Sequence, residues 1–512
     1  MESHQESIDL LNTSLKLCCM SMDNIKWGIL YSGCGIFQIY DEKDIKKFLP
    51  SFESDKEDES LEDVLLLRCS YKKGKPLLSF ADTDRKGRYM WSPNSFNKTI
   101  LPSSQAFAIL SLLKSIEVLE DKNTPLSYLM LLTAQNYYNF ATTYMRNEDG
   151  LFISVEDKTK NSEGEIKIKP IQNGAKLIEQ IFMYEALLYL YKATLKYGKD
   201  NTLSGLERYR IDSDNLFEFL YNNCNEIFEL SSKELSLAVS SFVRCLNLDD
   251  DTEKKQKYRL LVAMLCAELE SRIKITGEVE RGGIDTSITS IWTHFKTVSA
   301  LIEGYLETKI DIFKESALRT YNILLDLYDP IYSLFINGDY SKISYSIRDI
   351  CEILKCILLI YSIDSSRDTL NILIDFYKSS IENSNIMQST SFKNFNLKGY
   401  NLDITELPDI FSSSKAPVFI KSFRVSSKKS PSSITLSRQF NSFYSFYSSY
   451  IFLHYFGSVI DNFRDEENKI ISLADDINNT TIVSEISNRP IENTILTNDI
   501  GSNESNFFES IE

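Results

Sequence analysis

The strongest constraint on the fold is a series of predicted helices of two kinds. Residues 176–191 and 350–362 are apolar on most sides, whereas 232–247 has one apolar stripe and an opposite polar face. That polar face consists of Lys233, Ser240 and Arg244. A helix that is apolar all round is buried on every side, and a helix with one stripe covers it from outside. The alternation predicts two concentric layers, an inner and an outer ring of helices.

The helical period of the apolar residues predicts eleven helices. They are expected near residues 104–120, 125–146, 174–197, 212–229, 232–247, 252–275, 287–307, 310–328, 342–362, 366–384 and 440–458. An (α/α)6 toroid has twelve helices, and the missing one is expected within residues 5–20 or 463–476. The sequence therefore predicts an all-α protein, an (α/α)6-type toroid of paired helices.

The rest of the chain divides around this ring. Residues 1–80 form a lead-in segment whose short apolar runs predict a few strands. Residues 81–460 form the toroid domain, with a basic, Ser-rich insertion or loop at 385–440. Residues 461–512 carry a net charge of −9 and form an acidic, largely disordered tail. Because the strip 410–441 carries +6, this strip or the tail is a candidate site for a protein partner.

Composition excludes several classes of protein. A chain of 512 residues with 43% hydrophobic residues buries a large core, and its net charge of −16 argues against general nucleic-acid binding. The start of the chain lacks the features of a secretory signal and no apolar stretch suits a bilayer, so a cytoplasmic protein without membrane contact is expected. Nine cysteines without a CxxC pair indicate reduced core thiols. No metal site or cofactor is predicted.

Two segments together carry a resemblance to a known family. These are RKGRYMWSPNSFNKTILPSSQAFAILSLL, from Arg85, and the helix–NEDGLF–hairpin–helix segment around Asp149. Over about residues 85–385 the chain resembles the six-hairpin glycosidase-like superfamily, which includes N-acylglucosamine 2-epimerases and several glycoside hydrolase families. The resemblance implies a helical toroid that handles a sugar or oligosaccharide, hydrolytically if the protein is catalytic.

The candidate catalytic residues are carboxylates near the expected mouth of the ring. Asp149 and Glu148 lie in the NEDGLF hairpin, and Asp82 and Asp84 lie in the loop before the first toroid helix. Glycoside hydrolysis uses two carboxyl groups about 5–9.5 Å apart. Asp149 with Asp84 or Asp82 is therefore the predicted catalytic pair, and Glu148 a predicted substrate contact. A helix-end turn at Asp149-Gly150 and a solvated loop explain the same residues without catalysis.

Aromatic and basic side chains beside these carboxylates suit a carbohydrate. Shortly after Asp82 and Asp84 come Arg88, Tyr89 and Trp91. Aromatic rings stack on the CH faces of sugars. These last three residues are predicted substrate contacts, with Trp91 packed into the edge of the core as the alternative.

A second suggestive segment is EVERGGIDTSITSIWTH. Arg281 is expected to face an anionic or hydroxylated ligand, and Asp285 or Thr286 is expected to cap the next helix. Both Arg281 and Asp285 are predicted to bind substrate.

Two histidines support an alternative chemistry. The epimerase branch of the superfamily moves a proton with a pair of histidines, and His294 and His454 are the candidates here. His294 is also a predicted substrate contact, and a hydrogen-bonded histidine at the edge of the core is the competing interpretation.

Three functions follow from these residues. The first is carbohydrate handling, as a glycoside hydrolase acting through paired carboxylates at the mouth. The second is a non-enzymatic helical scaffold, and the third is a sugar 2-epimerase or isomerase. Convergence of Asp84 and Asp149 across a concave pocket would separate the first from the second.

The opposite charges of the strip and the tail generate a prediction. Deleting residues 479–512 should expose the basic strip, so the truncated chain should be retained longer on a heparin column below about 50 mM salt, where screening is weakest. Equal retention of the truncated and full-length proteins would show that the tail does not mask the strip.

Overall fold

The structure is a computed structural model. It describes residues 2–40, 64–80, 89–119, 122, 125–159, 165–171, 174–198, 203–282, 285–336, 343–387, 415–426 and 433–465. The chain divides into two units, Met1–Ile460 and Asp461–Glu512, and the fold described below is that of the first. Most of the predicted basic insertion and the tail beyond residue 465 lie outside the described residues, as do Asp82, Asp84 and Arg88.

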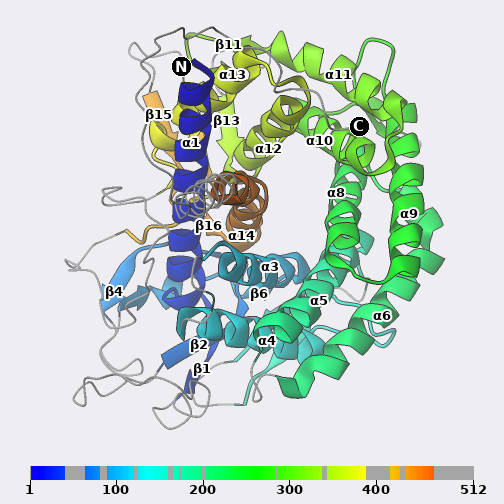
Figure 1. The fold of residues 1–512 in the computed structure, drawn as a ribbon. Helices are drawn as coiled ribbons and strands as arrows, with labels where there is room; N and C mark the ends of the chain where they lie inside the picture. Colours follow the sequence, from blue (N-terminus) through cyan, green and yellow to red (C-terminus); the bar gives the residue numbers. More distant parts are fainter. Residues whose placement is uncertain are drawn as a thin grey trace, which may run out of the picture. The chain divides into compact units, whose positions relative to one another are not determined.

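Six helices form a closed inner ring (Figure 1). Each packs against the next in chain order, and the last packs against the first. They are α3 (Pro102–Val118), α5 (Leu177–Tyr197), α8 (Ser232–Leu248), α10 (Ile291–Thr308), α12 (Ile347–Asp364) and α14 (Ser442–Ile451), which continues as the π-helical turn η5 (Phe452–Phe456).

Six more helices cover the inner ring from outside. They are α4 (Pro125–Tyr144), α6 (Leu206–Asn222), α9 (Thr252–Ser271), α11 (Asp311–Leu325), α13 (Arg367–Tyr377) and α1 (Glu2–Ile25). The first five each pack on the inner helix that precedes them, and α1 packs on α14. Among the described residues, twelve helices thus form six inner–outer pairs, and the predicted (α/α)6 toroid is confirmed. The twelfth helix is α1, which covers 5–20, the first of the two ranges in which it was expected.

A buried asparagine joins the two ends of the ring. Asn24 of α1 donates to Ser449 Oγ of α14 at 2.8 Å, and its Oδ1 accepts from Ser445 Oγ at 2.7 Å. The same oxygen accepts the backbone N–H of Phe419 at 2.9 Å. One side chain therefore holds α1, α14 and the segment before the last strands together.

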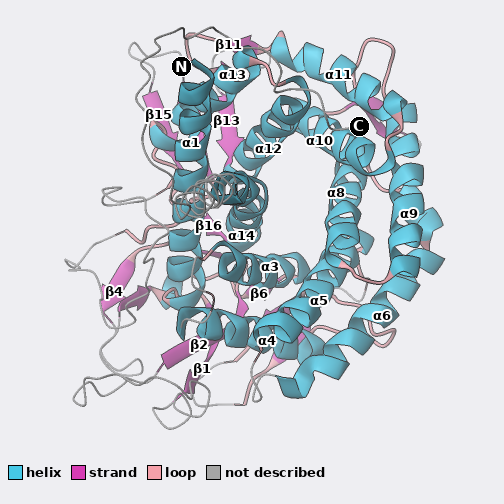
Figure 2. Cartoon of the chain, viewed as in Figure 1, coloured by secondary structure: helices cyan, strands magenta, loops and turns pink. Residues whose placement is uncertain are grey.

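The two ends of the ring differ in their connections. Inner-to-outer connections are short, as at 249–251, 309–310 and 365–366, and Lys309 and Ser365 end their helices in the left-handed conformation. Most outer-to-inner connections are long and contain the strands (Figure 2); the exception, at 223–231, is short and holds the helical segment α7. All of these long connections lead to the N-termini of inner helices, so irregular structure gathers at that end of the ring.

The strands pair in small antiparallel sheets. Before α3 lie β1 (Gly35–Tyr40), β2 (Val64–Ser70), β3 (Lys73–Gly74), β4 (Leu78–Phe80), β5 (Tyr89–Trp91) and β6 (Thr99–Ile100). Later connections carry β7 (Val155–Asp157), β8 (Ile168–Pro170), β9 (Glu280–Gly282), β10 (Asp285–Ile288), β11 (Tyr328–Asp329), β12 (Leu334–Phe335), β13 (Ile343–Ser346), β14 (Ser422–Ser426), β15 (Ser433–Leu436) and β16 (Phe440–Asn441). Shorter helical segments are η1 (Lys26–Leu30), η2 (Pro93–Ser95), η3 (Leu203–Gly205), α7 (Cys224–Phe228) and η4 (Lys378–Glu382). Strands within the lead-in segment were predicted and are present.

Helix α8 corrects one interpretation of the sequence. Its single apolar stripe indicated an outer helix with a solvated polar face, but α8 belongs to the inner ring and Ser240 and Arg244 are buried. The polar face turns toward the axis of the ring, where it meets polar side chains of other inner helices. A hydrophilic helix face therefore does not distinguish solvent from a polar interior.

The axis of the ring holds ion pairs rather than a purely apolar core. Arg244 donates to both carboxylate oxygens of Glu185 on α5, at 2.6 and 2.9 Å, and Tyr450 donates to the same carboxylate at 2.7 Å. Lys355 of α12 binds Glu303 of α10 at 3.0 Å. All four charged side chains are almost fully buried. Each pair joins two different inner helices, so these pairs fix how the helices are oriented around the axis.

Removing one partner of a buried pair should be costly. Arg244→Met is expected to lower the free energy of unfolding by about 3–5 kcal/mol, because it leaves the carboxylate of Glu185 buried without a counter-charge. The double variant Glu185→Gln with Arg244→Met should recover part of that loss. Urea denaturation followed by circular dichroism measures both values. A double variant no more stable than Arg244→Met would contradict this account.

Candidate functional site

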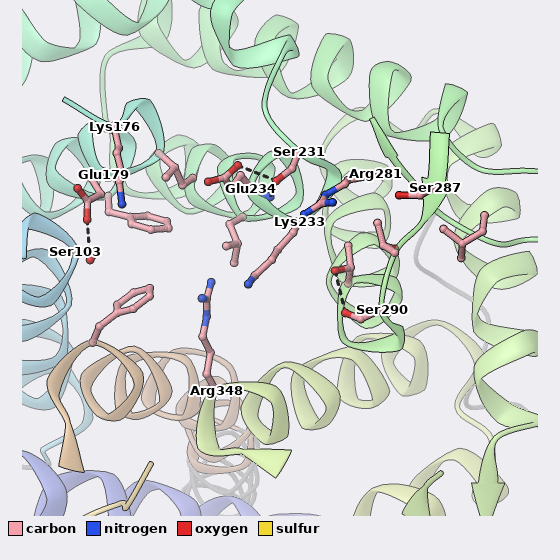
Figure 3. Close-up of a pocket in the computed structure, with 17 residues that line it drawn as sticks. Ser103, Lys176, Glu179, Ser231, Lys233, Glu234, Arg281, Ser287, Ser290 and Arg348 are labelled. Atoms are coloured by element: carbon pink, nitrogen blue, oxygen red, sulfur yellow. Dashed lines mark hydrogen bonds between the residues drawn. The ribbon is translucent and has the colours of Figure 1, made fainter. Parts of the chain in front are cut away.

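The first turns of the inner helices surround a cavity of about 740 Å³ (Figure 3). All six inner helices or the residues just before them contribute to it, together with the β9–β10 hairpin. Its lining consists of Ser103, Lys176, Ile178, Glu179, Phe182, Ser231, Lys233, Glu234, Leu237, Arg281, Ser287, Ile288, Thr289, Ser290, Thr293, Arg348 and Phe443. This cavity is the mouth of the ring, and its volume suits a small ligand.

Local capping places several of these side chains. Ser231 precedes α8, accepts the backbone N–H of Glu234 at 3.4 Å and donates its hydroxyl to the Glu234 carboxylate at 2.7 Å. Ser346 and Asp349 form a capping box at the start of α12, which leaves Arg348 between them in the sequence. Helix N-termini carry partial positive charge, and here those of the whole inner ring meet at one cavity.

Two carboxylates line the cavity, on neighbouring inner helices. Glu179 of α5 is buried and accepts a hydrogen bond from Ser103 Oγ at 3.2 Å. Burial raises the pKa of the Glu179 carboxyl, against the opposing effects of Lys176 and of the bond from Ser103. Glu234 of α8 is only partly buried. A raised pKa makes a carboxyl group a better candidate for a proton donor than an exposed one.

The β9–β10 hairpin forms one side of the mouth. Arg281 lines the cavity and binds Asp285 at 3.1 Å, so these two predicted substrate contacts lie together. Asp285 belongs to β10 and does not cap α10, because the chain continues as a strand; Ser290 is the N-cap residue. The capping prediction for Asp285 or Thr286 was therefore wrong.

His294 holds this hairpin against α10. Its Nε2 accepts the backbone N–H of Val279 at 3.1 Å, and its Nδ1 lies 3.0 Å from the carbonyl oxygen of Ser290. Burial lowers the pKa of the imidazole, which outweighs the opposite effects of Ser290 and Glu278. Both ring nitrogens are thus engaged by the backbone, as in the alternative given above.

His454 lies deeper along the axis. Burial, with the positive charges of Lys114, Arg244 and Lys355, holds the pKa of His454 well below its usual range. His294 is in the first turn of α10, whereas His454 is twelve residues beyond the first residue of α14. At the rise of an α-helix the two histidines differ in depth by about 14 Å, which exceeds the width of one sugar ring.

The hairpin carboxylates lie at the surface. Asp149 and Glu148 are exposed, and the Asp149 backbone N–H donates to Asn147 Oδ1 at 3.1 Å. Gly150 has a φ of 77°, the turn conformation that the Asp-Gly sequence indicated. Neither carboxylate is among the residues that line the cavity. Asp82, Asp84 and Arg88 lie outside the described residues. The convergence of Asp82 or Asp84 with Asp149 therefore stays a prediction.

Trp91 is fully buried and packs edge-to-face on Phe440, with ring centroids 4.8 Å apart. This packing matches the core position given as its alternative. Tyr89 is part of β5, where its backbone pairs with Phe80.

Sequence reasoning missed the carboxylates and cations at the helix starts. Glu179, Glu234 and Arg348 each lie in the first turn of an inner helix. For Glu179 and Arg348, a charged residue at the start of a helix that is otherwise apolar on most sides is the signal that could have identified them.

Comparisons with known proteins give a likeness of fold. No protein-family model matches the chain, and no curated protein matches it. Solved structures that match include a D-mannose isomerase, with 10% identity over 76% of this chain and 91% of that one and a TM-score of 0.46. A cellobiose 2-epimerase from Bacillus thermoamylovorans has 11% identity over 70% and 88%, with a TM-score of 0.46. A family 76 glycoside hydrolase from Bacteroides thetaiotaomicron has 8% identity over 88% and 78%, with a TM-score of 0.43.

These matches come from the superfamily that the sequence resembles. At such low identities and TM-scores they carry no argument about a ligand or a reaction, so the functional inference rests on the cavity itself. In the part of the chain that the structure describes, no helix has the length and apolar character needed to cross a membrane.

The position of His294 predicts a dependence of stability on pH. Its pKa is lower in the folded chain than in the unfolded chain, so the unfolded chain binds the proton first as the pH falls. The free energy of unfolding should therefore decline as the pH drops below about 6.5. Urea denaturation at pH 7.5 and 5.5 should show a smaller decline for His294→Gln than for the parent protein. Equal declines in the two proteins would contradict this role for His294.

Proposed function

We propose that the protein binds a sugar or short oligosaccharide in the mouth cavity and hydrolyses a glycosidic bond there, with Glu179 as the proton donor. The observation that carries the proposal is a buried carboxyl group of raised pKa facing a ligand-sized polar cavity. A general acid is more effective when its pKa lies closer to the working pH, and burial shifts the pKa of Glu179 upward, in that direction.

The second carboxylate in the proposed mechanism is Glu234. It lies on the inner helix adjacent to that of Glu179, and both line the same cavity. In this proposal Glu179 protonates the leaving oxygen, while Glu234 either activates water or attacks the sugar carbon. The proposal leaves the stereochemical outcome open.

The remaining lining suits a carbohydrate. Phe182 and Phe443 offer apolar ring surfaces for the CH faces of a sugar, and Ser290, Thr289 and Thr293 offer hydroxyls for its oxygen atoms. This mixture of aromatic surface and small hydroxyl groups would orient a ring between the two carboxylates.

A competing candidate is a ring that binds its ligand without catalysis. The hydrogen bond from Ser231 to the Glu234 carboxylate favours it, because a capping role alone explains that carboxylate. The pair predicted from the sequence, Asp149 with Asp84, stays a proposal for catalysis at the outer edge of the mouth. The same experiment distinguishes all three.

Glu179→Gln should lower kcat by about 100-fold or more, because the amide keeps the shape of the side chain and cannot donate a proton as an acid. Asp149→Asn is the matched variant at the exposed hairpin and should retain activity. Hydrolysis of a panel of aryl glycosides measures both, and thermal unfolding checks that both variants fold.

Three outcomes would count against the proposal. Loss of activity in Asp149→Asn with an active Glu179→Gln would move the acid to the hairpin. A parent protein that binds sugars in a thermal-shift assay but cleaves none of the panel would favour the non-catalytic candidate. Absence of any sugar binding would remove the carbohydrate proposal itself.

A further inference from the structure

The mouth cavity has the opposite charge to the chain as a whole. Its lining includes four basic side chains and two acidic ones, in a protein whose net charge is −16. The N-termini of the inner helices add partial positive charge around the same space. A positive cavity in an acidic protein attracts anions and repels cations.

Arg348 is the most unusual of these basic residues. It is only 7% exposed, and in Figure 3 its guanidinium extends from α12 into the cavity. The rings of Phe443 and Tyr447 lie 4.8 and 5.1 Å from it. Its Nε has no hydrogen-bond partner among the described residues. Aromatic packing thus holds the guanidinium in place and leaves its Nε–H donor unused.

The carboxylates near Arg348 are already engaged. Asp349 accepts from Ser346 at 2.6 Å and lies 3.7 Å from Lys296. Glu352, one turn further along α12, accepts a hydrogen bond from Tyr447. Within the described part of the chain, neither forms an ion pair with Arg348. The charge of Arg348 helps to lower the pKa of the Glu352 carboxyl, but the unused Nε–H shows that neither carboxylate satisfies the guanidinium fully.

Lys233 approaches the same space from α8. Figure 3 shows its amine directed toward Arg348. Partial burial and the positive charges of Arg348 and Lys296 lower the pKa of Lys233, against the opposite effects of Asp349 and Glu234. Two cations that face each other across a cavity repel until an anion lies between them.

We propose that Arg348 and Lys233 bind an oxyanion, a carboxylate or a phosphate, carried by the ligand of the mouth cavity. The inference rests on the proposed function, since it identifies the sugar as an anionic one. Arginine presents paired N–H donors that match two oxygens of such a group, and lysine adds a point charge. The carboxylate of a sugar acid and the phosphate of a sugar phosphate share this chemistry.

Isothermal titration calorimetry of the full chain tests the proposal, with inorganic phosphate, glucuronate, glucose 6-phosphate and glucose as probes. At least one anionic probe should bind, and more weakly as salt increases from 50 to 300 mM. Arg348→Gln should weaken that binding about tenfold or more, and Lys233→Gln should weaken it to a smaller degree. Glucuronate and glucose 6-phosphate together distinguish a carboxylate from a phosphate.

The control is Arg259→Gln, which removes an exposed cation from outer helix α9 and should leave binding unchanged. Lys233 is also accessible, so its variant tests the site even if Arg348→Gln fails to fold. Binding of glucose as tight as that of both anionic sugars, unaffected by either variant, would overturn the anion site and keep the carbohydrate proposal. Phosphate binding that Lys233→Gln or Arg348→Gln weakens, without binding of any sugar, would support the anion site and overturn the carbohydrate proposal.

Discussion

The closed ring depends on the contact between the helix near the start of the chain and the helix near its end. Five of the six inner–outer pairs are neighbours in sequence, but α1 and α14 are separated by more than 400 residues. Asn24 makes that contact specific, because its amide binds Ser445, Ser449 and the backbone of Phe419 in a buried setting. A buried amide left without these partners would be costly, so only the correct docking of α1 satisfies it.

Closure has a direct effect on the mouth. Because all inner helices run in the same direction, their N-termini meet at one end, and the long connections with their strands gather there too. The described connections at the other end are short, as at 249–251, 309–310 and 365–366. The axis between them is held by the ion pairs of Glu185 with Arg244 and of Glu303 with Lys355. Ring geometry, rather than a local motif, thus produces one positive and polar site.

The sequence was sufficient for the ring and insufficient for the site. A helix such as 176–191 can be recognised from the apolar residues on most of its faces. Eleven of the twelve helices were predicted, because periodicity is a local property of the sequence. The polar face of α8 led to the wrong layer for that helix. Its Arg244 pairs with Glu185, which is 59 residues away in sequence, and a local pattern does not show such a partner. Glu179 and Arg348 were overlooked for a similar reason. Each is an ordinary first-turn residue by itself, and only the meeting of separate helix starts makes it part of a cavity.

The position of α14 also bears on how the protein acquires its site during synthesis. A chain made from its N-terminus can form the local helix pairs in turn, but it remains an open arc until α14 emerges and fills the gap between α12 and α3. Phe443 and Tyr447, which hold the guanidinium of Arg348, arrive with that last helix. The mouth cavity is therefore completed by the same event that closes the ring, and a partly synthesised chain has the scaffold without the complete cavity.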